Sequence, residues 1–168
     1  MGLFDRAGLP SEDFRSLGEA IGGRVRVLAW ARGADGVVVG LPDRLAIQTR
    51  DGWRFVGWHD IDKGGWDAKD SRLRWALVGG GDDEVVLTEP GSLPDLFRER
   101  VGASIVVQQR FELSRGRAAM IVARRRLDDD RHPLIWSLSR QGGPFDVAQA
   151  DQAEAELARL RREYDIAG

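Results

Sequence analysis

A run of short alternating segments from Val25 to Thr88, followed at once by one amphipathic helix, constrains the fold of this chain most strongly. Apolar and polar residues alternate with a period of two, which is typical of half-buried β-strands. Turn residues separate the segments, and the Asp51-Gly52 pair is the strongest hairpin signal because glycine tolerates the positive φ angles of a tight turn. The pattern predicts seven strands, near 24–29, 37–39, 45–48, 53–58, 66, 72–77 and 85–87.

The helix after these strands has both a start and an end signal. Ser92 is a suitable N-cap, and Pro94 lies in the first turn, where the N–H that proline lacks has no helical partner. Gly102 is the expected end of the helix. The residues of its apolar stripe are Leu93, Leu96, Phe97 and Val101.

Beyond this helix the chain returns to strand pattern, which predicts three further strands near 105–113, 118–125 and 134–139. A Gly-Gly-Pro linker then leads to a final helix, with Asp146 as its cap and Gln149 at the capping-box position. Ser11 to Ile21 is also expected to be helical.

These elements predict an α+β fold that is mainly β with flanking helices: a seven-stranded barrel or sandwich with a capping helix, extended by a three-stranded segment and a C-terminal helix. A chain of 168 residues with 42% hydrophobic content is of the size of one domain. We therefore expect a single domain, 1–168, with a core at 24–103, a β extension at 104–140 and a terminal helix at 145–166.

One stretch of the predicted core is similar to a known family. The residues Val39 to Ile47, which lead through Asp51-Gly52 to Trp58 and Ile61, resemble the third and fourth strands of bacterial pleckstrin-homology-like domains. The resemblance covers about residues 24–103 and implies a barrel closed by a helix. The arginine-rich composition makes the chain similar to actinobacterial proteins of this type.

Composition excludes several kinds of chemistry. The chain has no cysteine, which removes disulfides, thiol catalysis and sulfur-ligated metal sites. His59 lies beside Asp60 and Asp62, but His132 is far away in sequence, so we expect no catalytic residues, no metal and no cofactor. The sequence has no apolar run long enough for a transmembrane segment, and its first residues lack the pattern of a secretory signal. These observations favour a cytoplasmic protein.

Two groups of residues remain as candidate binding contacts. Arg124, Arg125 and Arg126 form the densest positive patch and would suit phosphate groups, although Asp128 to Asp130 follow at once and favour local ion pairing. Trp30, Trp58 and Trp66 lie out of phase with the apolar face or near loops, and we expect one of them to be accessible to a partner, with Trp58 and Trp66 as the candidates.

We therefore expect a non-catalytic binding or scaffold module that recognises a protein or peptide, because a barrel of this kind leaves strand edges open to a partner strand. Two alternatives stay open. One is an enzyme acting on a small molecule in a pocket between the barrel and the C-terminal extension. The other is binding of lipid or nucleic-acid phosphates through the arginine cluster, although the net charge of −2 disfavours nucleic acid. The narrow stripe of the last helix (Ala153, Leu157, Leu160 and Tyr164) predicts a homodimer through that helix.

Overall fold

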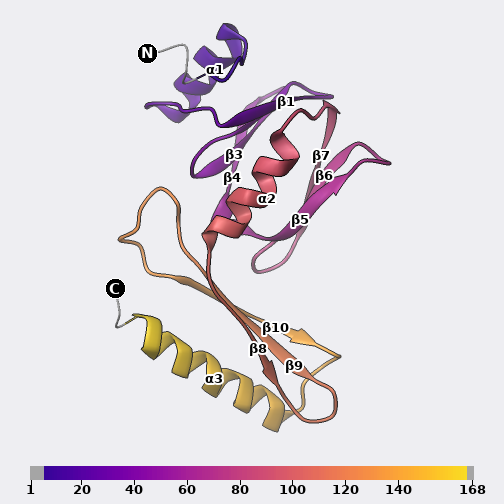
Figure 1. Ribbon diagram of the computed structural model, residues 1–168, viewed down its shortest axis with the longest axis vertical. Coiled ribbons are helices and arrows are strands. Elements are labelled where there is room, and N and C mark those ends of the chain that lie inside the picture. The colour runs from indigo at the N-terminus through magenta and orange to yellow at the C-terminus, as the bar shows by residue number, and fades with distance from the viewer. Residues whose placement is uncertain (1–5, 166–168) are drawn as a thin grey trace. The chain divides into compact units, whose positions relative to one another are not determined.

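The computed structural model describes residues 6–165, and its internal contacts divide the chain into two compact units, Met1–Ala103 and Ser104–Gly168. Each unit has a sheet of its own (Figure 1). The start of the chain and residue 166 of the predicted terminal helix lie outside the described residues.

The first unit has the predicted order of a helix, seven strands and a helix, and the α+β class is confirmed. Its strands form one antiparallel half-barrel sheet in the order β4-β3-β2-β1-β7-β6-β5. The elements are α1 (Ser11–Ile21), β1 (Ala29–Gly33), β2 (Val37–Gly40), β3 (Arg44–Thr49), β4 (Gly52–Gly57), the 3-10 turn η2 (Trp58–Asp60), β5 (Ile61–Asp67), β6 (Arg72–Leu77), β7 (Asp82–Glu89) and α2 (Leu93–Ser104).

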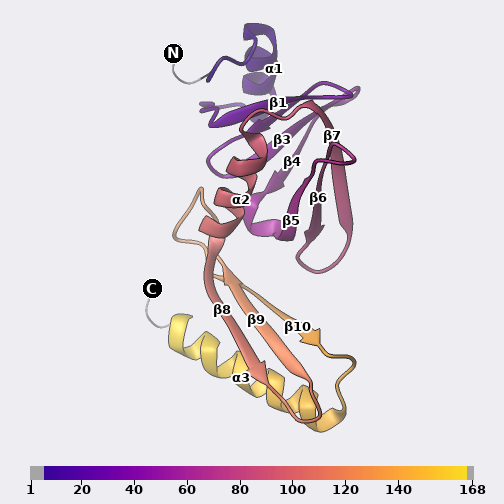
Figure 2. The ribbon, with the colours of Figure 1, turned by 45° about the vertical axis from the view of Figure 1, so that its right-hand side comes forward.

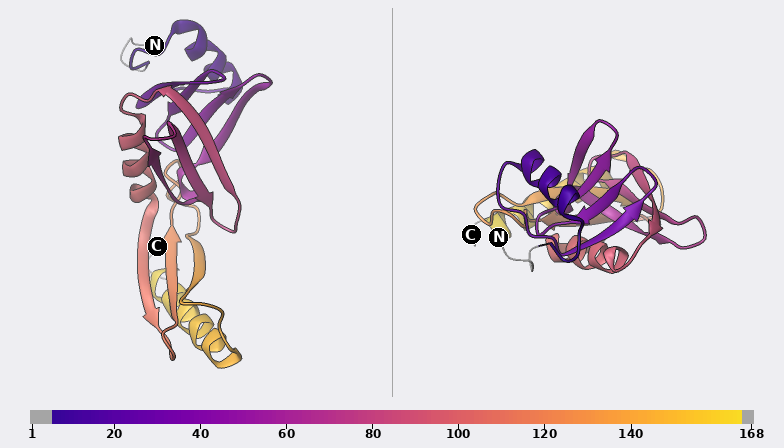
Figure 3. Two further views of the ribbon diagram at one scale, coloured as in Figure 1. Left: turned by 90° about the vertical axis from the view of Figure 1, so that its right-hand side faces the viewer. Right: turned by 90° about the horizontal axis from the view of Figure 1, so that it is seen from above.

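The half-barrel is two meanders joined through β1. This strand pairs with β2 on one side and with β7 on the other, where the register shifts between Arg32 and Gly33. The two meanders, β1 to β4 and β5 to β7, therefore continue into one curled sheet (Figure 3). Its two edge strands are β4 and β5.

The inner face of the half-barrel is packed by α2, which lies beside the strands in Figures 1 and 2. Phe97 of this helix is buried between two tryptophans, with ring centroids 5.9 Å from Trp58 and 6.1 Å from Trp75. The close approach needs glycine in the sheet: a Cβ on Gly40 would collide with the side chain of Leu96. Burial of these large rings is the main contribution of α2 to stability.

The outer face of β2 to β4 is packed by α1 and by the segment that leads into β1. Leu17 of the helix lies in one cluster with Val37 and Val39 of β2, and Trp53 and Phe55 of β4 pack against it. As a result β2 is buried on both of its faces. This explains why its sequence is continuously apolar rather than alternating.

Two element boundaries differ from the sequence prediction. The segment 24–28 is not a strand, although Val25 and Val27 are buried as an alternating pattern requires. Both valines pack in the cluster beneath α1, and the ladder begins only at Ala29. Gly102 does not end α2, which continues to Ser104. A glycine lowers the stability of a helix, but the helix continues through it when tertiary contacts fix the neighbouring residues.

The second unit is a three-stranded antiparallel sheet with one long helix, which follows the sheet in Figures 1 and 2. Its elements are β8 (Ile105–Glu112), β9 (Ala118–Arg124), β10 (Ile135–Gln141) and α3 (Val147–Asp165), with the sheet order β10-β9-β8. The central strand β9 is almost entirely buried. The predicted extension of three strands and a helix is thus confirmed.

The capping box of α3 forms as the sequence predicts. The backbone N–H of Gln149 donates to the Asp146 carboxylate at 2.8 Å, and that of Asp146 donates to the Gln149 side chain at 3.0 Å. Ala153 and Leu160 are buried within the unit. A homodimer through this stripe would therefore have to displace contacts that the helix already makes with its own sheet.

Trp75→Ala tests the packing of the inner face. The indole ring is 2% exposed and touches Phe97, so its loss leaves a large cavity. We expect a loss of about 3–5 kcal/mol in the free energy of unfolding, measured by denaturant titration. A loss below about 1 kcal/mol would contradict the placement of this face.

Glu156→Gln tests the ion pair between Glu156 and Arg159 within α3 through its pH dependence. The hydrogen bond from Arg159 holds the pKa of Glu156 below its ordinary value of 4.5. The Glu156 carboxyl therefore binds a proton less readily in the native state than in the unfolded state. Its ionised form stabilises the native state fully above pH 4.5, and this stabilisation is lost as the pH falls through the lower native pKa. We expect the melting temperature of the parent protein to fall more steeply below that pH than that of the variant. Parallel curves would contradict the assignment.

Candidate functional site

The edge strand β5 is the element of the first unit with the most open surroundings. It pairs with β6 alone, and two glycines at its centre stand opposite Trp75 and Arg74. Glycine in a strand interior weakens the strand and often marks a close approach of another group. The two glycines, Gly64 and Gly65, have opposite surroundings because neighbouring residues face opposite sides of a sheet.

Gly64 faces the packed interior. A Cβ there would lie 2.5 Å from the carbonyl oxygen of Arg74 and 2.9 Å from the Phe97 ring, so only glycine fits. Gly65 faces the outside, and a Cβ there would meet nothing within 4 Å. The first glycine is needed by the fold, whereas the second leaves space on the surface.

That space is part of a depression of about 580 Å³ across β5, β6 and β7. It is open to solvent, and both signs of charge surround it. Its charged lining residues are Lys63, Arg74, Asp82, Asp83 and Glu84, with Gly64, Gly65, Trp75 and Ala76 completing the wall. Such a surface accepts an extended chain with polar side chains better than it encloses a small apolar molecule.

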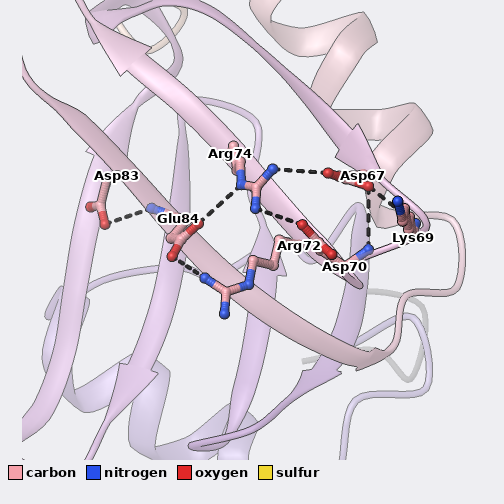
Figure 4. Close-up of polar contacts among 7 residues, drawn as sticks. All are labelled: Asp67, Lys69, Asp70, Arg72, Arg74, Asp83 and Glu84. Atoms are coloured by element: carbon pink, nitrogen blue, oxygen red, sulfur yellow. Dashed lines mark hydrogen bonds and ion pairs between the residues drawn. The ribbon is translucent and has the colours of Figure 1, made fainter.

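An ion-pair network centred on Arg74 borders this depression (Figure 4). Its guanidinium donates to Glu84 at 3.1 Å, to Asp67 at 2.8 Å and to Asp70 at 3.0 Å. Arg72 also donates to Glu84. Hydrogen bonds to Glu84 and then Asp70 raise the pKa of Arg74 above its ordinary value. The network therefore holds the β5–β6 turn against β7.

A second ion pair faces the interior of the half-barrel. The Arg54 guanidinium of β4 donates through both terminal nitrogens to the Asp83 carboxylate of β7. These strands are far apart in the sheet order, so this contact crosses the curled sheet. A guanidinium that donates two hydrogen bonds to one carboxylate fixes the orientation of the two groups relative to each other. Arg54 and Asp83 thus link the two meanders from the inside.

Trp66 lies where the sequence places an accessible tryptophan. It belongs to the edge strand β5, stands opposite the buried Leu73 and is itself half-buried.

The position of Trp58 differs from what its place in the strand pattern suggests. It is fully buried, its Nε1–H donates to the carbonyl of Leu41 at 2.8 Å, and its ring meets Phe97 edge to face. The strand pattern fails here because Trp58 begins the 3-10 turn η2, which rotates its side chain into the core. Trp58 is therefore not the accessible tryptophan, and its place as a candidate binding residue is corrected.

The arginine cluster does not form one surface patch. Arg124 is 1% exposed and donates to the Ser137 hydroxyl at 3.4 Å. Arg126 donates to Asp128 at 2.9 Å, which is the local ion pairing favoured by the sequence. Of the three, Arg125 alone is exposed. The structure thus separates residues that a phosphate-binding site would need together.

Each of the two histidines lies beside one carboxylate of its own unit. The ring of His59 is 3.5 Å from the carboxylate of its neighbour Asp60, and His132 is 2.8 Å from Asp129. Residues 6–165 contain no group of three or more His, Asp or Glu side chains arranged to hold a metal ion. In the same range no helix is long and apolar enough to cross a membrane.

No family model, curated protein or solved structure matches the chain.

Sequence reasoning missed the residues around the depression. Arg72 and Arg74 have their partner Glu84 on another strand, and only the register of β6 against β7 brings it opposite Arg74. The signal available in the sequence was the Gly64-Gly65 pair beside Trp66.

Substitution of the two neighbouring glycines tests this geometry with a matched pair. Gly64→Ala forces the backbone of Arg74 and the Phe97 ring to move, and we expect it to lower the free energy of unfolding by about 1–3 kcal/mol. Gly65→Ala meets open space and should change it by less than about 0.5 kcal/mol. Denaturant titration measures both, and equal effects would contradict the opposite surroundings of the two positions.

Proposed function

We propose that the first unit is a non-catalytic binding module that adds an extended segment of a partner protein to the β5 edge of its half-barrel sheet. The observation that carries this proposal is the open surface at Gly65, beside a strand that is paired on one side only. An added strand gains main-chain hydrogen bonds from the edge and side-chain specificity from the surfaces beside it.

The side chains beside the β5 edge suit this role. Trp66 offers a half-buried indole on the inner face, and the depression next to Gly65 is free to receive a partner side chain on the outer face. Lys63 and Asp82 line the depression, and among the described residues neither makes an ion pair. A partner segment that carries both an acidic and a basic side chain would complement them.

The other edge strand is less suited to a partner. Trp53 and Phe55 of β4 pack against the cluster beneath α1, and Arg54 is committed to Asp83. The side chains on both faces of β4 are thus already engaged, whereas the outer face of β5 is open at Gly65. This contrast favours β5.

The resemblance of residues 24–103 to pleckstrin-homology-like domains supports a binding role, because a barrel of that kind presents strand edges beside its helix. Fold likeness alone does not assign an activity. The proposal therefore depends on the β5 edge itself.

Selection of peptides from a random displayed library against the full chain tests the proposal. We expect the selected peptides to slow amide hydrogen exchange in β5. A Cβ at Gly65 meets nothing within 4 Å, so Gly65→Arg places a long side chain over the depression and should weaken their binding at least about tenfold, because a partner side chain loses its place.

Gly23→Arg is the matched control, because Gly23 is also exposed and has open space around its Cβ. This variant should bind as the parent protein does. Peptides that protect amides elsewhere, or that bind equally to Gly65→Arg, would contradict the proposal.

A further inference from the structure

The second unit contains an edge strand without the usual protection against strand pairing. β10 pairs regularly with β9 over its full length, from Ile135 opposite Arg124 to Gln141 opposite Ala118. It has no bulge and no proline, and its single charged residue is Arg140. Regular and sparsely charged edges are the ones that pair with another chain.

The opposite edge of the same sheet is protected. The register of β8 shifts between Ile105 and Val107, and the strand carries two charged residues, Arg110 and Glu112. A bulge and charged side chains both oppose addition of a strand. The difference between the two edges points to β10 as an interaction surface.

The helix α3 crosses its sheet obliquely and leaves one end of β10 uncovered. Gln149 donates to Ser114 in the β8–β9 turn at 2.8 Å, and Gln109 of β8 donates to Glu156 at 3.3 Å. The last turn of α3 reaches β10 instead, where the rings of Tyr164 and Trp136 lie 6.2 Å apart.

The two ends of β10 therefore differ. Trp136 near its start lies under the last turn of α3, and its Nε1–H donates to Asp165 at 3.5 Å. Arg140 near its end is exposed on the same face of the sheet, because residues four apart in a strand share a face. Tyr164 beside Trp136 also remains 38% exposed.

We propose that β10 pairs antiparallel with β10 of a second copy of this chain, with Leu138 of each copy at the two-fold axis. This register sets Trp136 opposite Arg140 of the second copy. Ser137 then stands opposite Ser139, and the two three-stranded sheets join into one. A two-fold interface requires a self-complementary surface, and this strand has that pattern about Leu138.

Charge complementarity supports this partner over an unrelated strand. Arg140 of the second copy lies beside Trp136 and within reach of Asp165, so it can stack on the indole and pair with the carboxylate. The two-fold axis makes each contact twice. The last turn of each α3 lies over the start of its own β10. In the dimer this start stands opposite the end of β10 of the second copy, which that copy's α3 leaves uncovered. The two helices therefore do not compete for space.

Charge exchange tests the interface in the full chain by sedimentation equilibrium. Arg140→Asp and Asp165→Arg each place like charges together, and each should raise the dissociation constant of the dimer at least about tenfold. The double variant Arg140→Asp/Asp165→Arg restores opposite charges and should recover most of the affinity. Arg162→Glu, also exposed in the last turn of α3, is the matched control and should leave it unchanged.

Cysteine pairing tests the register, because the natural sequence has no cysteine. Residues directly opposite each other in a ladder are close enough for a disulfide, whereas diagonal neighbours are about 7–8 Å apart. An oxidised mixture of Ser137→Cys and Ser139→Cys chains should form covalent heterodimers, and each variant alone should form few. A monomer at all concentrations, or equal cross-linking in mixed and separate samples, would overturn the proposal.

Discussion

The contact of Phe97 with Trp58 and Trp75 is the constraint on which the first unit depends. The three rings come from α2, from η2 and from β6, so one cluster joins the helix to both halves of the sheet. Glycine at positions 40 and 64 lets α2 come this close to the sheet. The Phe97 side chain of α2 is thus at the centre of the packing between the helix and the half-barrel.

The same packing decides which surfaces are free. On the β1 to β4 side, α2 occupies the inner face and α1 the outer face, so β2 and β3 have apolar residues on both. On the β5 to β7 side the outer face is exposed and is held by ion pairs around Arg74 instead. Exposed ion pairs contribute little to the free energy of folding, so the charges on this face do little to stabilise the first unit.

The second unit uses a different arrangement, in which a short sheet is stabilised by one long helix. Three strands alone make a marginal sheet, and α3 buries one face of it. The capping box at Asp146 and Gln149 fixes where this helix begins, and Gln149 also donates to Ser114 of the sheet. The narrow apolar stripe of α3 is sufficient because the sheet supplies the other side of the contact.

The sequence by itself determined the order of the elements, the α+β class, the Asp51-Gly52 hairpin and both ends of α1. These follow from short-range patterns, since alternation, capping and turn chemistry involve residues that are neighbours in the chain. Only the tertiary structure decided that Trp58 and Arg124 are buried, that Glu84 stands opposite Arg74, and that the edges are β4 and β5. Each of these depends on which distant segment becomes a neighbour, and a pattern of period two is the same whichever strand lies beside it.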